Sequence, residues 1–231
     1  MSGSTWQARR SQIETYFDRT AAETWKRLTS DAPVSGIRAT VRAGRDAMRA
    51  TLLSWLPAEM HGLRLLDAGC GTGALAVEAA RRGAQVVAID VSRSLLEVAR
   101  ERAGAAARNI RFEVGDMLDP CLGAFDHVVA MDSLIHYRAA DAVQALSGLA
   151  SRTRGSILFT FAPRTALLAA MHTVGRIFPR GDRAPAIEPV AEAALRRLIE
   201  GAPGLAGFAP RHGKRIASGF YTSQAMELLK R

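Results

Sequence analysis

An acidic residue followed by alternating glycines is the feature of this 231-residue sequence best suited to bind a small molecule. Asp67 ends an apolar run, and Gly69, Gly71 and Gly73 follow it before a helical pattern begins at Ala74. Glycine lacks a Cβ and tolerates positive φ, so a ligand can lie directly against the backbone of such a turn. Dinucleotide-binding turns use a longer G-x-G-x-x-G spacing, which cradles a pyrophosphate. The G-x-G-x-G spacing and the acid before it argue against a phosphate ligand.

Acidic residues also end the next three predicted strands. The four strands span 63–67, 85–89, 110–114 and 125–131, and the acids at or just after their ends are Asp67, Asp90, Asp116 and Asp132. In an open α/β sheet the carboxyl ends of parallel strands meet at one edge, where ligands bind. An acid after the second strand accepts hydrogen bonds from ribose hydroxyls in such folds. Asp116 has two open interpretations, a contact to a bound base or the cap of a turn.

The glycine turn and its acid resemble motif I of the class I S-adenosylmethionine-dependent methyltransferases, whose cofactor has a cationic sulfonium and no phosphate. The resemblance implies an α/β fold with a Rossmann-like, mainly parallel seven-stranded sheet, an N-terminal helical extension and a helical insertion after the fifth strand. It also implies S-adenosylmethionine as the methyl donor. The residues expected to bind the cofactor are Asp67, Gly69, Cys70, Gly71, Gly73, Asp90, Val91, Ser92, Gly115, Asp116, Met117, Asp132 and Ser133.

Length and composition fit one domain of this kind. A chain of this size with 48% hydrophobic residues can bury a substantial core. Cys70 and Cys121 form neither a disulfide pattern nor a metal-ligand spacing, so we expect a reducing compartment and no resident metal. The N-terminus is polar and charged, which predicts no signal peptide, and no segment offers twenty apolar residues to span a bilayer. We therefore expect a cytoplasmic protein.

Arginine supplies most of the net charge of +9. Such a surplus suits an acidic partner, whether nucleic acid, anionic lipid or a carboxylate-bearing substrate. The arginines recur singly along predicted helices instead of forming a basic block, as at Arg38, Arg42, Arg45 and Arg49. We interpret them as solvated helical faces, so charge alone does not identify a partner.

The single predicted domain, residues 1–231, divides into four segments. Residues 1–60 form a helical extension or lid, 62–162 the cofactor-binding core, 163–206 a helical insertion or substrate cap, and 207–231 the closing strands. In the first segment, Thr20 and Glu23 form a capping box that predicts a short helix, and apolar spacing predicts a second helix over 37–55.

The last two segments combine an apolar stretch with predicted regular structure. Residues 164–178 are apolar over most of a helical circumference and too short to cross a bilayer. Three interpretations stay open for this stretch: the wall of a hydrophobic substrate pocket, an interfacial helix or a plain buried helix. Beyond them we predict a helix over 190–199 and a strand pair over 207–216 and 220–229, although the end at Glu227 also fits a helix.

Motifs outside the glycine turn indicate a narrower family. They are Tyr16–Leu28, the helix that begins at Ile37, the run Met131–Tyr137 and the segment Phe161–Thr165. Together they resemble the magnesium-protoporphyrin IX O-methyltransferases of chlorophyll and bacteriochlorophyll biosynthesis, over nearly the whole chain. The resemblance implies transfer of the sulfonium methyl to one propionate of magnesium-protoporphyrin IX. The products are then the monomethyl ester and S-adenosylhomocysteine.

The resemblance also implies roles for residues near the transferred methyl. We expect His136 and Tyr16 to be catalytic, with His136 orienting the propionate, ligating the porphyrin magnesium or serving only as a structural histidine. Tyr137, Arg164 and Arg38 are candidates to bind the substrate, because arginine pairs with carboxylates through two parallel hydrogen bonds. Magnesium enters only as part of the porphyrin.

The expected partners are magnesium-protoporphyrin IX, the porphyrin-binding subunit of magnesium chelatase and, peripherally, the photosynthetic membrane, with no nucleic acid. Nucleic-acid amino-methyltransferases carry Asn/Asp-Pro-Pro-Tyr/Phe after the fourth strand, where this chain has Asp-Ser-Leu-Ile at 132–135. Two alternatives stay open. One is an O-methyltransferase that acts on another hydrophobic small molecule, and the other is a noncatalytic partner of the chelatase.

Overall fold

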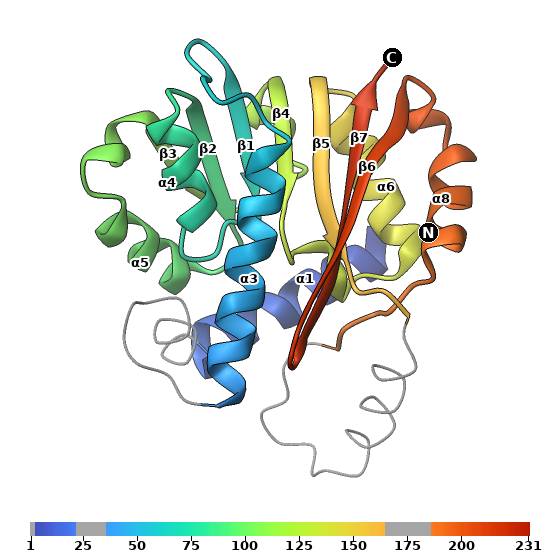
Figure 1. Cartoon of the computed structure of the whole chain (residues 1–231), viewed down its shortest axis with the longest axis horizontal. Coiled ribbons are helices and arrows are strands. Elements are labelled where there is room, and N and C mark those ends of the chain that lie inside the picture. Colours follow the sequence, from blue (N-terminus) through green and yellow to red (C-terminus); the bar gives the residue numbers. More distant parts are fainter. Residues whose placement is uncertain (1–2, 22–35, 165–185) are drawn as a thin grey trace.

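A seven-stranded sheet organises the part of the chain that the structure, a computed structural model, describes: residues 3–21, 36–164 and 186–231 (Figure 1). The strands are β1 (Arg64–Ala68), β2 (Gln85–Asp90), β3 (Ile110–Val114), β4 (Phe125–Ala130), β5 (Thr153–Phe161), β6 (Phe208–Ser218) and β7 (Tyr221–Lys230). They lie in the order β3-β2-β1-β4-β5-β7-β6. Neighbours from β3 to β5 are parallel, and β7 is antiparallel to β5 and β6. The expected mainly parallel seven-stranded sheet is confirmed.

Helices cover both faces of this sheet, so its parallel strands are apolar on both sides. In β2, Val86 and Ala88 face one layer of helices while Val87 and Ile89 face the other. The first layer contains α3 (Ile37–Ser54) and α4 (Ala74–Arg81), and the second contains α1 (Gly3–Thr15), α6 (Ala139–Ala150) and α8 (Glu192–Glu200). In Figure 1, α3 crosses in front of the strands and α6 lies behind them.

The remaining elements are one helix and several short turns. Helix α5 (Arg93–Ala103) packs beside β2 and β3. The short turns are η1 (Tyr16–Ala21, π-helical), η2 (Gly104–Asn109), η3 (Pro120–Leu122), η4 (Leu134–His136) and η5 (Pro203–Leu205). Turn η1 contacts α5, so the N-terminal segment returns to the edge of the sheet at which the parallel strands end.

Most predicted boundaries agree with the structure within two residues. Helix α3 ends one residue before the predicted end, and β3 matches its prediction at both ends. Strand β4 ends at Ala130 instead of residue 131, and α8 begins at Glu192 instead of residue 190. Glu227 lies inside β7, so the helical alternative for the C-terminal end is wrong.

Two predicted features lie outside the described residues. One is the short helix that the capping box at Thr20 predicts, since residues 22–35 are not described. The other is the apolar stretch, of which Arg164 alone is described. Thr20 itself lies within the π-helical turn η1.

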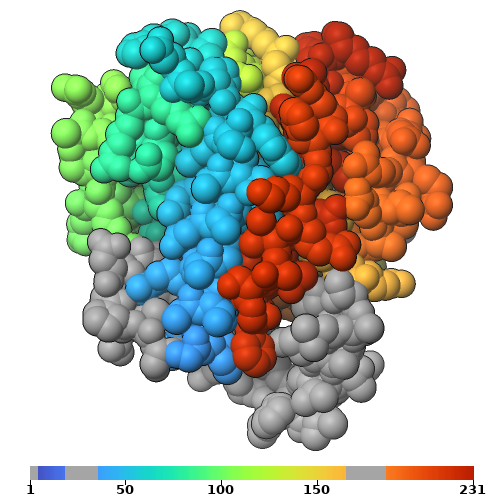
Figure 2. All heavy atoms as spheres, viewed as in Figure 1, coloured from blue at the N-terminus to red at the C-terminus, as the bar shows by residue number. Residues whose placement is uncertain are grey.

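Close packing at two glycines fixes helix α3 against the β6–β7 hairpin, beside which it lies on the surface in Figure 2. A Cβ at Gly44 would lie 2.4 Å from Cδ1 of Tyr221, so the tyrosine ring rests directly on the helix backbone. At Gly219, where φ is +55°, a Cβ would lie 2.5 Å from Oγ1 of Thr40. These two contacts hold the first half of α3 along the hairpin and set the direction of its neighbouring side chains.

Candidate active site

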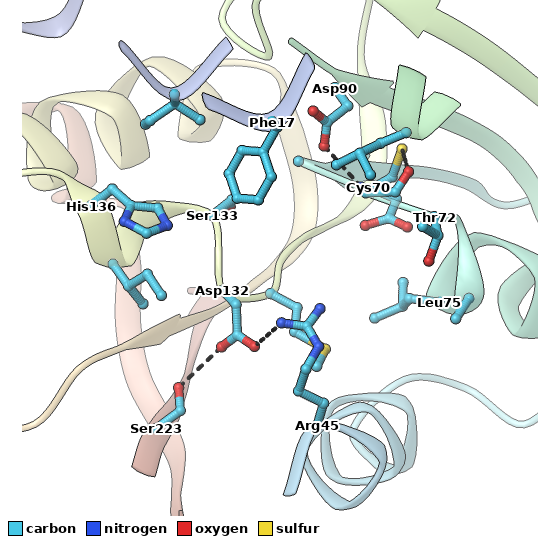
Figure 3. Close-up of a pocket in the computed structure, with 18 of the residues that line it drawn as sticks. Phe17, Arg45, Cys70, Thr72, Leu75, Asp90, Asp132, Ser133, His136 and Ser223 are labelled. Atoms are coloured by element: carbon cyan, nitrogen blue, oxygen red, sulfur yellow. Dashed lines mark hydrogen bonds and ion pairs between the residues drawn. The ribbon is translucent and has the colours of Figure 1, made fainter. Parts of the chain in front are cut away.

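A cavity of about 590 Å³ opens where the parallel strands end. Its walls come from the ends of β1, β2 and β4, from α3, from the N-terminal helices and from the turn between β6 and β7 (Figure 3). The predicted site residues that line it are Tyr16, Asp67, Gly69, Cys70, Gly71, Asp90, Val91, Gly115, Met117, Asp132, Ser133, His136 and Tyr137. Gly73, Ser92, Asp116, Arg38 and Arg164 do not line the cavity that the described residues form.

The glycine turn adopts the conformation that its spacing predicts. Gly69, Gly71 and Gly73 have φ values of +80°, +53° and +77°, a region that side chains with a Cβ rarely enter. A Cβ at Gly69 would lie 2.4 Å from Cβ of Ser133, and one at Gly73 would lie 2.9 Å from Cβ of Ala99. No heavy atom lies within 4 Å of the corresponding position at Gly71. Gly71 therefore offers bare backbone to a ligand, whereas Gly73 permits close packing of α4 on α5.

Two carboxylates stand beside this turn. Asp67 is 2% exposed, and its Oδ2 accepts a hydrogen bond from the N–H of Ala76 at 3.1 Å. Burial, together with the charge of Asp90, raises the pKa of Asp67 to about 7 despite that hydrogen bond. Asp90 accepts hydrogen bonds from the N–H groups of Gly71 at 2.8 Å and Ser92 at 2.9 Å, and burial raises its pKa as well. Carboxylates in such surroundings favour a ligand that carries positive charge or hydroxyl donors.

The side chains of Ser92 and Asp116 form hydrogen bonds with protein groups, and neither lines the cavity of the described residues. The hydroxyl of Ser92 caps α5 by accepting from the N–H of Leu95 at 3.2 Å. Asp116 accepts a hydrogen bond from Nε1 of Trp6 at 3.1 Å and another from the N–H of Leu118 at 2.9 Å. Of the two interpretations of Asp116, the structure therefore supports the turn cap. The flanking residues of Asp116, at positions 115 and 117, do line the cavity.

The N-terminal helices are tied to the sheet edge by one carboxylate in particular. Asp18 of η1 accepts hydrogen bonds from Oγ of Ser92 at 2.6 Å, from Oγ of Ser94 at 3.0 Å and from the N–H of Ser94 at 3.2 Å. An acid in this place also complements the positive end of the α5 dipole. The adjacent Phe17 lines the cavity, so this contact places an aromatic ring in the cavity wall.

Asp132 follows β4 with a φ of +53°, and it is the one non-glycine residue of the described chain with a positive φ. Its N–H donates to Oγ1 of Thr160 at 2.7 Å. Its carboxylate accepts hydrogen bonds from Arg45, Thr160, Tyr221 and Ser223 at distances of 2.8–3.2 Å. Backbone strain of this kind persists only where the surrounding structure holds it. Figure 3 shows Arg45 reaching the carboxylate from α3 and Ser223 reaching it from β7.

The two predicted catalytic residues and Tyr137 all line the cavity. His136 belongs to η4, and its Nδ1 lies 3.4 Å from the carbonyl oxygen of Ala186. Tyr16 packs edge-on against Phe17, with 5.1 Å between ring centroids. Tyr137 is buried and stacks on Trp6, and burial raises the pKa of its hydroxyl. Tyr137 is therefore a neutral wall residue, while His136 and Tyr16 are the more accessible of the three.

Three arginines of α3 line the cavity, and the sequence interpretation of them as a solvated face is wrong. They are Arg42, Arg45 and Arg49, spaced three and four residues apart and so on one side of the helix. The predicted substrate arginines, Arg38 and Arg164, are exposed and lie outside the cavity walls that the structure describes. Helical spacing places Arg38 on the same side as these three, so the sequence carries no signal that separates it from the arginines of the cavity wall.

Comparison with known proteins identifies the family. Over 220 residues the chain is 50% identical to the magnesium-protoporphyrin O-methyltransferase of Rhodobacter capsulatus, which spans 94% of this chain and 95% of that protein. The chain belongs to the magnesium-protoporphyrin O-methyltransferase family. The family member of a Synechocystis strain is 28% identical over 223 residues, with the same coverage of 94% and 95%.

Family models and solved structures agree with this membership. The model of the magnesium-protoporphyrin IX methyltransferase C-terminus matches residues 130–230, and a general methyltransferase domain model matches residues 65–155. The crystal structure of the Synechocystis magnesium protoporphyrin IX methyltransferase with bound S-adenosylhomocysteine has a TM-score of 0.84 at 27% identity. It covers 96% of this chain and 100% of its own, and the same enzyme is also known with bound S-adenosylmethionine. The predicted family, class I methyltransferase fold, enzyme class and methyl donor are confirmed.

Proposed function

We propose that this chain transfers the methyl group of S-adenosylmethionine to a propionate carboxylate of magnesium-protoporphyrin IX. A propionate oxygen forms the new bond to carbon while the methyl–sulfur bond breaks and its electron pair stays on sulfur. The products are the porphyrin monomethyl ester and S-adenosylhomocysteine. The reaction then serves chlorophyll or bacteriochlorophyll biosynthesis.

The observation that supports this reaction most is that one cavity combines two kinds of wall. On one side, Asp67, Asp90 and the glycine turn come from the segment that matches the general methyltransferase domain. On the other side, His136, Ile187 and Phe220 come from the segment that matches the family-specific C-terminus. The first wall, which we call the cofactor end, suits a cationic cofactor. The second, the substrate end, suits a carboxylate carried on a flat apolar macrocycle.

The transfer needs little acid–base chemistry. A propionate has a pKa of about 4.3, so it is already ionised at neutral pH. An anionic nucleophile and a cationic donor become a neutral ester and a neutral thioether, and a cavity that excludes water favours this loss of charge. The protein therefore contributes mainly alignment and desolvation.

We assign His136 and Tyr16 to the alignment of the reacting propionate. His136 belongs to η4, the turn that follows β4, and lines the family-specific wall. Tyr16 lines the same cavity from the N-terminal side. We expect His136→Ala to lower kcat by about 10²-fold and Tyr16→Phe by a smaller factor. Both variants should bind S-adenosylhomocysteine within about twofold of the unaltered protein, which would separate alignment from loss of the cofactor.

The test of the reaction is direct. The purified protein is incubated with S-adenosylmethionine and magnesium-protoporphyrin IX, with zinc-protoporphyrin in parallel, and the porphyrin is analysed by chromatography and mass spectrometry. A mass gain of one CH₂ unit on the metalloporphyrin supports the proposal. Cofactor binding by calorimetry without any mass gain would reject the porphyrin and would leave another hydrophobic carboxylate or phenol as the acceptor.

We further propose that the cavity mouth contacts an anionic membrane surface. Phe220, Ile187 and Ile37 are 54%, 36% and 55% exposed, the first two line the cavity, and the net charge is +9. None of the helices in the described ranges is long and apolar enough to cross a membrane. Cosedimentation with vesicles that contain phosphatidylglycerol, and weaker cosedimentation of Phe220→Ser, would support the contact. Equal binding to neutral vesicles would contradict it.

Delivery of the substrate by the porphyrin-binding subunit of magnesium chelatase is the second proposed contact. A metalloporphyrin is a large apolar molecule, so transfer between proteins avoids its release into water. Methylation of porphyrin presented on that subunit should continue in the presence of albumin as a trap for free porphyrin. Complete inhibition by the trap would show that the porphyrin passes through solution.

A further inference from the structure

Arg45 and Asp132 form an ion pair in the cavity. This pair has no role in the proposed alignment of the reacting propionate. The pair joins α3 to the end of β4, with 2.8 Å between Nη1 of Arg45 and Oδ2 of Asp132. The side chain of Arg45 is 23% exposed, whereas that of Asp132 is 6% exposed. Both residues line the cavity, and Arg45 is the more exposed of the two.

The carboxylate of Asp132 is saturated by protein donors. Oδ1 accepts from the hydroxyls of Thr160, Tyr221 and Ser223, and Oδ2 accepts from Arg45 and from Tyr221. A carboxylate offers about four lone-pair sites, so these five contacts use its capacity. This arrangement does not suit the direct cofactor contact that the sequence predicts for Asp132.

The surroundings of the pair fix the guanidinium in place. Burial raises the pKa of Tyr221, which keeps its hydroxyl a donor to Asp132. The ring of the same tyrosine rests on the backbone of α3 at Gly44, one residue before Arg45. Helix α3, strand β7 and the end of β4 are thus joined in a closed circuit of contacts, and the strained φ of Asp132 is part of it.

We propose that Arg45 is a carboxylate-binding residue of the cavity and that Asp132 is its positioning residue. A guanidinium has five N–H donors in a planar fork that matches a carboxylate, and the hydrogen bond to Asp132 uses one of them. Two ligand carboxylates are available in the proposed reaction, the one at the methionine end of the cofactor and the propionate that is not methylated. Either would be costly to bring out of water without a cationic partner.

The position of the pair is compatible with both sources. Ser133, next to Asp132, lies against Gly69 of the cofactor turn, where a Cβ would come within 2.4 Å. On the opposite side, β7 and its turn carry the apolar residue Phe220. The ion pair therefore stands at the border between the cofactor end and the substrate end of the cavity.

The test compares Arg45→Gln with Arg81→Gln, a matched loss of charge on the exposed surface of α4. Calorimetry measures the affinity for S-adenosylhomocysteine and for its decarboxylated analogue. Fluorescence measures the affinity for magnesium-protoporphyrin IX and for its dimethyl ester with S-adenosylhomocysteine present. Arg45→Gln should weaken binding of one carboxylate-bearing ligand roughly 10- to 100-fold and leave its carboxylate-free analogue within twofold. The affected ligand identifies the source.

Affinities of Arg45→Gln within twofold of the control for both carboxylate ligands would overturn the proposal. The porphyrin measurement rests on the proposed function, but the cofactor measurement does not. If the unaltered protein methylates no porphyrin while Arg45→Gln still loses affinity for S-adenosylhomocysteine, the proposed function fails and this inference stands.

Positioning by Asp132 has its own measurement. Tyr221→Phe keeps the ring on Gly44 but removes a hydroxyl from Asp132, so it should weaken the same ligand several-fold. In the Arg45→Gln background the same change should have no further effect on affinity, because the residue being positioned is gone. Full additivity of the two changes, in variants that melt as cooperatively as the unaltered protein, would overturn the positioning role.

Discussion

The cofactor end and the substrate end of the cavity are built by different kinds of contact. At the cofactor end the bonds join near neighbours in the sequence, Asp67 to Ala76 and Gly71 to Asp90. Where the substrate end begins, Asp132 is joined to Arg45 across 87 positions and to Tyr221 across 89. A strand, a turn and a helix suffice to form the first set, whereas the second requires the whole sheet. The proposed cofactor end is therefore readable from a motif, whereas the proposed substrate end depends on topology.

The largest effect is expected where the two ends touch, at Gly69. Gly69→Ala would bring a Cβ to 2.4 Å from Cβ of Ser133 at a φ of +80°. Overpacking and the left-handed backbone together should lower the free energy of unfolding by about 2–4 kcal/mol. Affinity for S-adenosylhomocysteine should fall at least about tenfold. Thermal melting and calorimetry measure the two effects.

Gly62→Ala is the matched control for this variant. Gly62 has a φ of +76°, but no heavy atom lies within 4 Å of its Cβ position. It should lose about 1 kcal/mol from the backbone term alone and keep its cofactor affinity. Equal losses in the two variants would mean that the contact between the two ends is not tight.

We expect the affinity for S-adenosylmethionine to depend on pH, by up to about tenfold per pH unit. Burial raises the pKa of Asp67 to about 7, so its carboxyl is protonated below that pH and charged above it. A cationic ligand prefers the charged form, so the Kd for S-adenosylmethionine should fall as the pH rises from 6 to 7 and then level off. Calorimetry at constant ionic strength checks this, and Asp67→Asn should flatten the profile.

The same pKa shift has the opposite effect on the ligand-free protein. The folded state holds the proton of Asp67 more tightly than the unfolded state, in which the pKa is near 3.8. The contribution of Asp67 to the free energy of unfolding should therefore decrease as the pH rises from about 4 to about 7. An increase over this range that Asp67→Asn does not remove would belong to other groups.

A smaller effect is expected where the N-terminal helices meet the cofactor end. Asp18→Ala removes the acceptor for Ser92 and Ser94 and should cost about 1 kcal/mol of docking free energy. Cleavage by trypsin at Arg9 and Arg10 should become several-fold faster. Asp141→Ala, which removes an exposed bond to Thr5 of the same segment, is the control and should change the cleavage rate little.

Acid should loosen the same contact. Burial alone would raise the pKa of Asp18, but hydrogen bonds from Ser92 and Ser94 outweigh it and hold the pKa below 3.8. The contact therefore stabilises docking above that pH and is lost as the pH falls through the lowered pKa. Cleavage by an acid protease should accelerate in the unaltered protein but not in Asp18→Ala, whose contact is already absent.

The smallest effects are expected at the two arginines that the sequence assigns to the substrate. Arg38→Gln and Arg164→Gln should change KM for the porphyrin by no more than about twofold, because surface charges contribute little. Arg42→Gln, on the cavity wall, should raise KM by more than either. A larger effect of Arg164→Gln than of Arg42→Gln would restore the sequence assignment.

The sequence predicts the elements of the cofactor end well because their determinants are local. Glycines at fixed spacing specify the turn at 69–73, and apolar runs specify β2 and β3 almost to the residue. Ser92 and Asp116 do not line the cavity of the described residues, and their side chains bond to Asp18 and Trp6, which lie 74 and 110 positions away. No periodicity in the sequence records such contacts.

Which arginines line the cavity could not be predicted from the sequence, for a related reason. Helical spacing groups Arg38, Arg42, Arg45 and Arg49 on one side of a helix, but it does not say which turns of that side face a cavity. Packing determines which arginines face the cavity, because Tyr221 rests on Gly44 and fixes how α3 lies along the hairpin. The strand pair itself is predictable, whereas its contact with a helix about 180 residues earlier is not.

The bonds of Asp18 also bear on how quickly the protein can exchange its cofactor. Phe17 lines the cavity, and the neighbouring carboxylate is tied to Ser92 and Ser94, which are groups of the protein and not of the ligand. We expect release of S-adenosylhomocysteine to require that this contact opens, a first-order step whose rate does not rise with the concentration of incoming cofactor. Turnover should then be limited by product release and not by methyl transfer.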